Sequence, residues 1–218
     1  VLGKAVPVRS DPEAVSLDAE AISAFSADGQ KPAAVVVALP PKTGALLLRS
    51  AYEFGLTEGV QILLTNTAQS DQLLKNVGKA ADGKFILSGA IGTTPSIKGS
   101  SISDFTKFWR DKTNSVPDMF VSQTWDAASL IVLAAQAAGS NQGAQIKTKL
   151  QDVANEPGVA VTDVCQGLKL LREGTEINYN GVSGKVEIDA NGDVPGDYDV
   201  WTIDEQNRIK TIEQGKFD

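Results

Sequence analysis

The stretch Lys31–Leu64, KPAAVVVALPPKTGALLLRSAYEFGLTEGVQILL, decides the fold class. Its segment Ala33–Leu39 is continuously apolar and rich in valine, which is typical of a parallel strand buried on both faces. Two prolines end that strand, and apolar residues at helical spacing then run from Lys42 or Thr43 to Phe54. Gln61–Leu64 is the next apolar run. The stretch therefore predicts a strand–helix–strand unit of a parallel sheet.

The same alternation continues on both sides of this stretch. Apolar spacing predicts helices over Asp18–Ala27 and Asp71–Val77. Short strands are predicted over Gly3–Arg9 and Lys84–Ser88. Two glycines and a proline in Gly89–Pro95 then interrupt the pattern. We interpret that interruption as a crossing segment between two lobes of an α/β protein.

Residues 90–194 predict helices with almost no sheet, so this region looks incomplete by itself. After the predicted helices, the pattern turns to strands over Gly184–Asp189 and Tyr198–Asp204. The Asn191-Gly192 pair between these two strands predicts a hairpin. The predicted helices are Ile102–Asp111, Gln123–Ala138 and Gln145–Asn155.

Composition excludes several classes of function. The 218 residues carry a net charge of −7, which argues against a nucleic-acid surface. The absence of histidine and the single cysteine, Cys165, remove most zinc sites and histidine-based acid–base catalysis, but leave carboxylate or lysine catalysis open. No apolar run reaches the ~18 residues of a membrane helix. No signal-peptide pattern follows Val1, so a signal peptide would have to precede it.

Three local patterns invite a cofactor or metal interpretation, and each has a simpler one. Asp189–Asp193 lacks the glycine position and the flanking helices of a helix–loop–helix calcium site and predicts a plain turn. Gly89–Gly92 and Gly181–Gly184 match neither nucleotide-binding glycine pattern and predict turns or a hinge. The sequence therefore predicts no cofactor, no metal and no enzyme activity.

Polar residues follow the two strongest predicted strands. Lys42 and Thr43 come after the valine-rich strand, and Thr65, Asn66 and Thr67 come after Gln61–Leu64. Ligands of open parallel sheets sit at the carboxyl ends of strands, and a helix N-terminus there offers free N–H groups to anionic atoms. We expect these residues to contact a ligand; the alternative is ordinary polar loops with a solvated Lys42.

The aromatic residues and the cysteine have mostly structural interpretations. Phe105 and Phe108 lie three apart on a predicted helix, which favours core packing. Trp125, beside Asp126 near a helix start where a carboxylate suits the helix dipole, is a further candidate for a ligand contact. Cys165 is expected to be a small buried residue. The alternative for Cys165 is a disulfide to a cysteine outside residues 1–218.

Four stretches, taken in order, resemble type I periplasmic solute-binding proteins of branched-chain amino-acid ABC transporters. They cover most of the chain, and their order and spacing are more specific than any single motif. They are KPAAVVVALPPKTGALLLRSAYEFGL (31–56), QILLTNTAQSDQLLKNVGKAADGKFILS (61–88), FTKFWRDKTNSVPDMFVSQTWDAASLIVLAAQAAGS (105–140) and YNGVSGKVEIDANGDVPGDYDVWTID (179–204).

The resemblance implies a two-lobed α/β fold of parallel sheets flanked by helices. Residues 1–88 would form the second lobe, 89–194 the returning part of the first lobe, and 195–218 a return to the second. The sheet of the first lobe would then come from a preceding segment. Hinge motion is expected at Gly89, Gly92, Pro95 and Gly196.

The resemblance also implies a function: binding of a small polar solute between two lobes, outside the cytoplasmic membrane, for ABC transporter permease subunits. A lipid anchor would lie outside these residues. On the second lobe, Leu39 or Pro40 occupies the position after the valine-rich strand. Asn66 stands where the family often has a carboxylate for a ligand ammonium, which shifts the expectation from an ordinary amino acid towards a neutral, amide-like or anionic solute.

Other functions stay open at this point. A ligand-sensing receptor or regulator domain of the same fold is the first alternative. An enzyme on a Rossmann-like sheet is the second, because a fold does not fix a function. A structural fragment that is not functional alone is the third.

Overall fold

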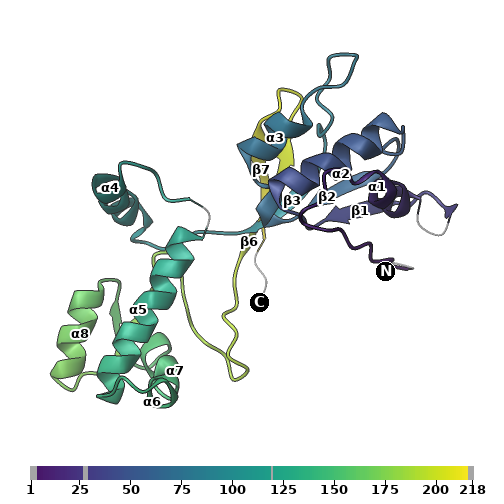
Figure 1. The fold of residues 1–218 in the computed structure, drawn as a ribbon. Coiled ribbons are helices and arrows are strands. Elements are labelled where there is room, and N and C mark those ends of the chain that lie inside the picture. Colours follow the sequence, from purple (N-terminus) through teal and green to yellow (C-terminus); the bar gives the residue numbers. More distant parts are fainter. Residues whose placement is uncertain (1–3, 27–28, 119, 216–218) are drawn as a thin grey trace. The chain divides into compact units, whose positions relative to one another are not determined.

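The computed structural model describes residues 4–26, 29–118 and 120–215 (Figure 1). The chain divides into two compact units. Among the described residues, unit 1 holds those up to Pro95 and those from Asp197 to Gly215, and unit 2 holds those between Ser96 and Gly196. The chain therefore passes from unit 1 to unit 2 after Pro95 and returns after Gly196. The assignment of these units to the two expected lobes stays a prediction.

Unit 1 is built on a five-stranded mixed sheet with the strand order β1-β2-β3-β6-β7. The first three strands are parallel to one another, and β6 runs antiparallel to both β3 and β7. The strands are β1 Ala34–Val37, β2 Gln61–Leu64, β3 Ile91–Pro95, β6 Tyr198–Ile203 and β7 Ile209–Gly215.

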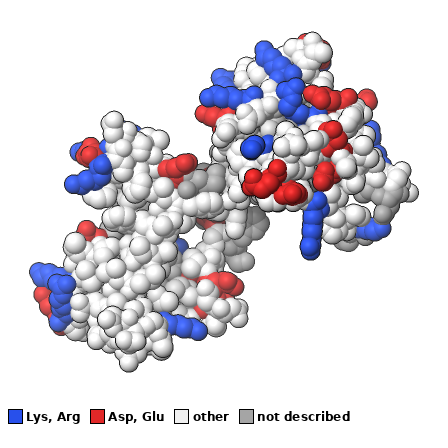
Figure 2. Space-filling view, in the orientation of Figure 1, with Lys and Arg blue, Asp and Glu red and all other residues white. Residues whose placement is uncertain are grey.

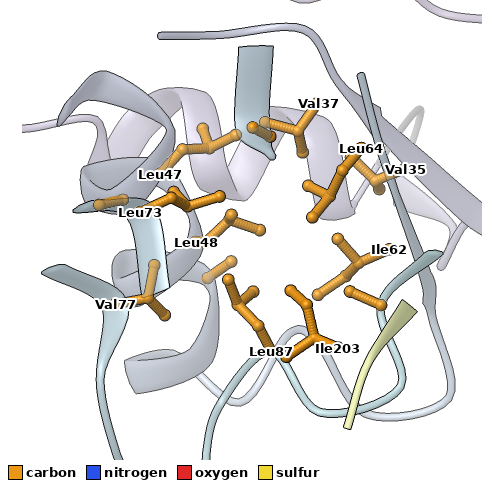
Figure 3. Close-up of a cluster of buried hydrophobic side chains, with 14 of the residues drawn as sticks. Val35, Val37, Leu47, Leu48, Ile62, Leu64, Leu73, Val77, Leu87 and Ile203 are labelled. Atoms are coloured by element: carbon orange, nitrogen blue, oxygen red, sulfur yellow. The ribbon is translucent and has the colours of Figure 1, made fainter. Parts of the chain in front are cut away.

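Helices α1 Asp18–Phe25, α2 Pro41–Glu53 and α3 Asp71–Val77 contribute to the core of unit 1. Successive side chains of a strand point to opposite faces, so Val35 and Val37 of β1 are buried while Val36 is 65% exposed. Figure 3 shows the strand side chains meeting Leu48 of α2 and its neighbours. The parallel βαβ order predicted from Lys31–Leu64 is thus confirmed, but the expected burial of the valine-rich strand on both faces is wrong in these residues, because Val36 is exposed.

One glycine of this sheet is required by packing. Gly92 of β3 pairs with Trp201 of β6, and the indole is fully buried. A Cβ built on Gly92 would lie 2.1 Å from Cζ2 of that indole. No side chain fits there unless the ring moves.

Unit 2 is mainly helical and contains a small βαβ unit. Strand β4 Val159–Val161 pairs in parallel with β5 Ile177–Tyr179, and α8 Val164–Arg172 connects them. Its core gathers Leu133, Val153, Ile177 and Tyr179, each almost fully buried. The other helices are α4 Ile102–Thr113, α5 Val121–Ala138, α6 Gly143–Lys147 and α7 Leu150–Ala154. Among the described residues, no helix combines the length and apolar composition that a membrane crossing requires.

Several helix and strand predictions need correction. Lys84–Ser88 forms turns and one isolated bridge instead of a strand, because its apolar Leu87 fills the core from a turn. Gln145–Asn155 is two short helices, α6 and α7, instead of one. Residues 4–9 have no regular structure, and Gly3 and Ala27 lie outside the described residues. The paired strands β4 and β5 were not predicted, because three residues each are too few to show a period.

The predicted hairpin is also wrong. Tyr198–Ile203 pairs with β3 and β7, and Gly184–Asp189 forms no strand. The Asn191-Gly192 turn is real but local: Oδ1 of Asp189 accepts the backbone N–H groups of Asn191 and Asp193, both at 2.8 Å. The interruption at Gly89–Pro95 largely becomes strand β3.

Candidate functional site

The candidate site lies at the carboxyl edge of the parallel strands of unit 1. Val37, the last residue of β1, is in register with Leu64, the last residue of β2. The two loops that follow therefore leave the sheet at the same edge. Pro40 precedes α2, and the first helical residue is Pro41, whose missing N–H costs nothing at that position.

Hydrogen bonds join the two loops. The Thr67 hydroxyl donates to the carbonyl of Leu39 at 3.3 Å, and the Thr65 and Thr67 hydroxyl oxygens lie 3.1 Å apart. The Thr65 N–H points to the carbonyl of Val37 at 3.4 Å. Asn66 begins a short 3-10 turn, Asn66–Ala68, and is half-buried. The structure thus brings Leu39, Thr65 and Thr67 together, with Asn66 between the two threonines.

The start of α2 supplies the other predicted residues. Thr43 is buried, and its hydroxyl donates to the carbonyl of Pro40 at 3.2 Å. The hydroxyl proton is therefore used in a hydrogen bond at the start of α2. Pro40 and Lys42 are exposed. Residues 39–43 and 65–67 include no carboxylate, and Lys42 is their one charged side chain. This edge can accept and donate hydrogen bonds and attract an anionic group. The ligand-binding role of these residues stays a prediction.

Trp125 belongs to unit 2, where it joins an aromatic cluster of α4 and α5. Its ring centroid lies 5.3 Å from that of Phe105 and 5.6 Å from that of Phe108. Phe105 is buried, as predicted, whereas Phe108 is 42% exposed and so only partly packed. Trp125 is 36% exposed, so part of its side chain is accessible in unit 2. Its role as a ligand contact stays a prediction.

The four hinge candidates occupy different settings. Gly89 has a φ of +83° that favours glycine, and Pro95 is the last residue of β3. Gly92 lies inside the sheet under Trp201, which gives it a packing role. Gly196 is the last residue of unit 2 before the chain returns. Their hinge role stays a prediction.

Unit 2 holds a polar cluster whose role the sequence did not reveal. Asp126 was expected to interact with the dipole of its helix, but its carboxylate is buried and accepts hydrogen bonds from the Tyr179 hydroxyl and from the loop at Val182 and Ser183. Burial raises the pKa of the Tyr179 hydroxyl above its ordinary value. The signal available in the sequence was a lone acid in an otherwise uncharged helix.

Two other predictions concern single residues of unit 2. Cys165 is exposed in the first turn of α8, so the expectation that it is buried is wrong: it lies on the outer side of that helix. Asp189 forms the local turn described above, and backbone N–H groups lower the pKa of its carboxyl. Within the described ranges, no group of three or more His, Cys, Asp or Glu side chains could hold a metal ion.

With this geometry in place, comparison with known proteins identifies the family. A family described as "Receptor family ligand binding region" matches residues 6–206. The chain belongs to this family. Its members bind ligands, in keeping with the predicted solute-binding class. A relative in Halobacterium salinarum, the chemotactic signal transduction system substrate-binding protein BasB, is 27% identical over 128 residues, which cover 52% of this chain and 31% of that protein.

Solved structures of similar proteins show the same fold. The leucine-binding protein LivK of Thermotoga maritima has a TM-score of 0.65 at 19% identity, over 94% of this chain and 49% of its own. LivJ of Streptococcus pneumoniae, in complex with isoleucine, has a TM-score of 0.54 at 15% identity, over 87% of this chain and 47% of its own. A solute-binding protein of R. palustris, in complex with benzoate, has a TM-score of 0.53 at 14% identity, over 93% of this chain and 47% of its own.

These comparisons confirm the predicted resemblance and fold class. The chain is an α/β protein of the type I periplasmic-binding-protein fold. It spans about half the length of the solved structures that it matches, with shares of 49% and 47%. The activity, the solute and the partners of the whole protein are therefore matters for proposal.

Proposed function

We propose that the carboxyl edge of β1 and β2 holds a small polar solute, and that the protein is the extracytoplasmic solute-binding component of an ABC uptake system. The observation that carries this proposal is the hydrogen bond from Thr67 to the carbonyl of Leu39. It joins the loops of two neighbouring parallel strands into one polar edge, where open α/β sheets bind ligands. The similar solved structures include a leucine-binding protein and a complex with isoleucine, which supports solute binding.

The chemistry of this edge favours a solute group that is neutral, amide-like or anionic. An ammonium group removed from water needs a carboxylate or a set of acceptors, and residues 39–43 and 65–67 carry no carboxylate. Asn66 offers both an amide donor and an acceptor, and exposed Lys42 offers a positive charge. The benzoate complex of the R. palustris protein supports the proposal that this fold accepts small carboxylates.

Isothermal titration of the whole protein tests the proposal. The panel is leucine, isoleucine, their amides, urea-like compounds and small carboxylates including benzoate. Thr67→Val keeps the shape of the side chain and removes the hydroxyl, and we expect it to weaken binding by about tenfold. Thr57→Val, on the loop before β2 at the opposite edge, is the matched control and is expected to bind as the wild type does. Failure of every compound to bind would contradict the proposal.

Two charge variants test the chemistry of the solute. Lys42→Met is expected to weaken anionic solutes and leave neutral ones unchanged, because it removes the one cation of the edge. Asn66→Asp is expected to favour solutes with an ammonium group over anions. Lys84→Met, on a turn outside the candidate site, is the control for net charge. If Lys42→Met and Lys84→Met weaken the same anion equally, the carboxyl edge is not its site.

A sensing role is the second candidate function, and the similarity to a chemotactic substrate-binding protein favours it. In that case the loaded protein is recognised by a signal transducer instead of permease subunits. Uptake of the identified radiolabelled solute by cells with and without the gene separates the two roles. Loss of uptake supports transport, whereas unchanged uptake with a lost behavioural response supports sensing.

A further inference from the structure

Helix α5 carries one charged residue, and that residue is buried. Asp126 is 2% exposed, and Figure 2 shows a largely uncharged surface where α5 lies in Figure 1. Its Oδ1 accepts the Tyr179 hydroxyl at 3.0 Å and the Val182 N–H at 2.7 Å. Its Oδ2 accepts the N–H of Ser183 at 2.7 Å and the Ser183 hydroxyl at 2.5 Å. Both oxygens are thus fully used, as a buried carboxylate requires.

The loop held by Asp126 packs tightly against its carboxylate. A Cβ built on Gly181 would lie 2.3 Å from Oδ2 of Asp126, so only glycine allows this approach. The loop is therefore fixed from two sides, by hydrogen bonds to Val182 and Ser183 and by close contact at Gly181. Such a loop has little freedom to move while the carboxylate stays in place.

The other side of this loop contacts the segment through which the chain enters unit 2. The Lys98 N–H donates to the carbonyl of Ser183 at 2.9 Å. A Cβ built on Gly99 would lie 2.0 Å from the carbonyl oxygen of Val182. The entering segment thus lies directly against the backbone of the loop.

We propose that Asp126 is a positioning residue that anchors the entering segment. The carboxylate fixes the loop 181–183, and the loop fixes Lys98 and Gly99. Because β3 ends at Pro95, only Ser96 and Ile97 lie between the sheet of unit 1 and this anchor. The anchor therefore limits bending of the first connection between the units to the residues before Lys98. This role holds whatever solute the protein binds.

Site-resolved hydrogen exchange of the whole chain tests the anchor. Asp126→Asn keeps the size of the side chain but turns one acceptor oxygen into a donor that faces two donors. We expect amide exchange at Lys98, Val182 and Ser183 to rise by about tenfold or more. Amides of the neighbouring strand Ile177–Tyr179 are expected to keep their protection, which a general loss of stability would not allow.

Three further variants separate anchoring from folding. Tyr179→Phe removes one of the four hydrogen bonds and keeps the carboxylate, so a smaller rise at Lys98 is expected. Gly99→Ala should release Lys98 while Val182 stays bonded to Asp126, and Gly143→Ala, where a Cβ meets nothing within 4 Å, is the glycine control.

The outcomes decide the proposal. Unchanged exchange at Lys98 in Asp126→Asn, with Val182 and Ser183 released, would overturn it. An equal rise over all of unit 2 would also overturn it, because Asp126 would then serve the fold alone. The exchange readout needs no solute, so failure of the binding experiments leaves it unaffected.

Discussion

Replacement of Gly92 by alanine tests whether the close packing of Trp201 on β3 stabilises the sheet of unit 1. The new Cβ would lie 2.1, 2.3 and 2.6 Å from three atoms of the buried indole. Carbon atoms in contact need about 3.5 Å, so the ring must move by more than about 1 Å inside a filled core. Overpacking of this kind costs about 1–3 kcal/mol, and we expect the upper end because the clash involves backbone-bonded Cβ and a rigid ring.

Gly44 provides the matched control in the same unit. A Cβ there meets its nearest atoms at 3.7 Å, which is ordinary contact distance. Gly44 lies in α2, where alanine is favoured over glycine by about 1 kcal/mol or less. Gly44→Ala is therefore expected to stabilise the protein slightly, whereas Gly92→Ala destabilises it.

Urea unfolding followed by circular dichroism measures both effects as shifts of the midpoint at constant slope. A double-mutant cycle with Trp201→Phe isolates the clash, because phenylalanine lacks the second ring. The cost of Gly92→Ala should shrink in that background. A cost below about 0.5 kcal/mol, or one that persists with Trp201→Phe, would refute the assigned packing.

Two further predictions concern titration and reactivity. Hydrogen bonds from Lys210 and Arg208 hold the pKa of Asp204 below its ordinary value, so its contribution to stability is present above the unfolded pKa of about 3.9 and is lost as pH falls towards the folded pKa. Asp204→Asn should therefore lower the free energy of unfolding at pH 7 and lower it less near pH 2, as urea titrations at both values would show; an equal loss at both would contradict this assignment. Cys165 is exposed, so a thiol reagent should label the native protein at one site per chain without denaturant. Labelling that needs unfolding would contradict that exposure.

The sequence located most of the candidate site because strand ends are local features. A valine-rich run that stops at two prolines, and QILL followed by Thr-Asn-Thr, mark two neighbouring strand ends without any tertiary information. The sequence does not show which atoms of these two loops contact each other. Only the structure shows that the Thr67 hydroxyl contacts the Leu39 carbonyl and that the hydroxyl of Thr43 turns to its own helix.

By itself, the sequence determined the unit of two parallel strands and a helix over β1, α2 and β2, together with helices α1, α3, α4 and α5, because the spacing of apolar residues reports how each segment buries its own side chains. The tertiary structure decided the pairing of Tyr198–Ile203 with Ile91–Pro95 across more than a hundred residues. It also decided the need for glycine beneath Trp201 and the anchoring of a loop by Asp126. These features depend on which distant surfaces meet when the chain closes, and no local pattern carries that information.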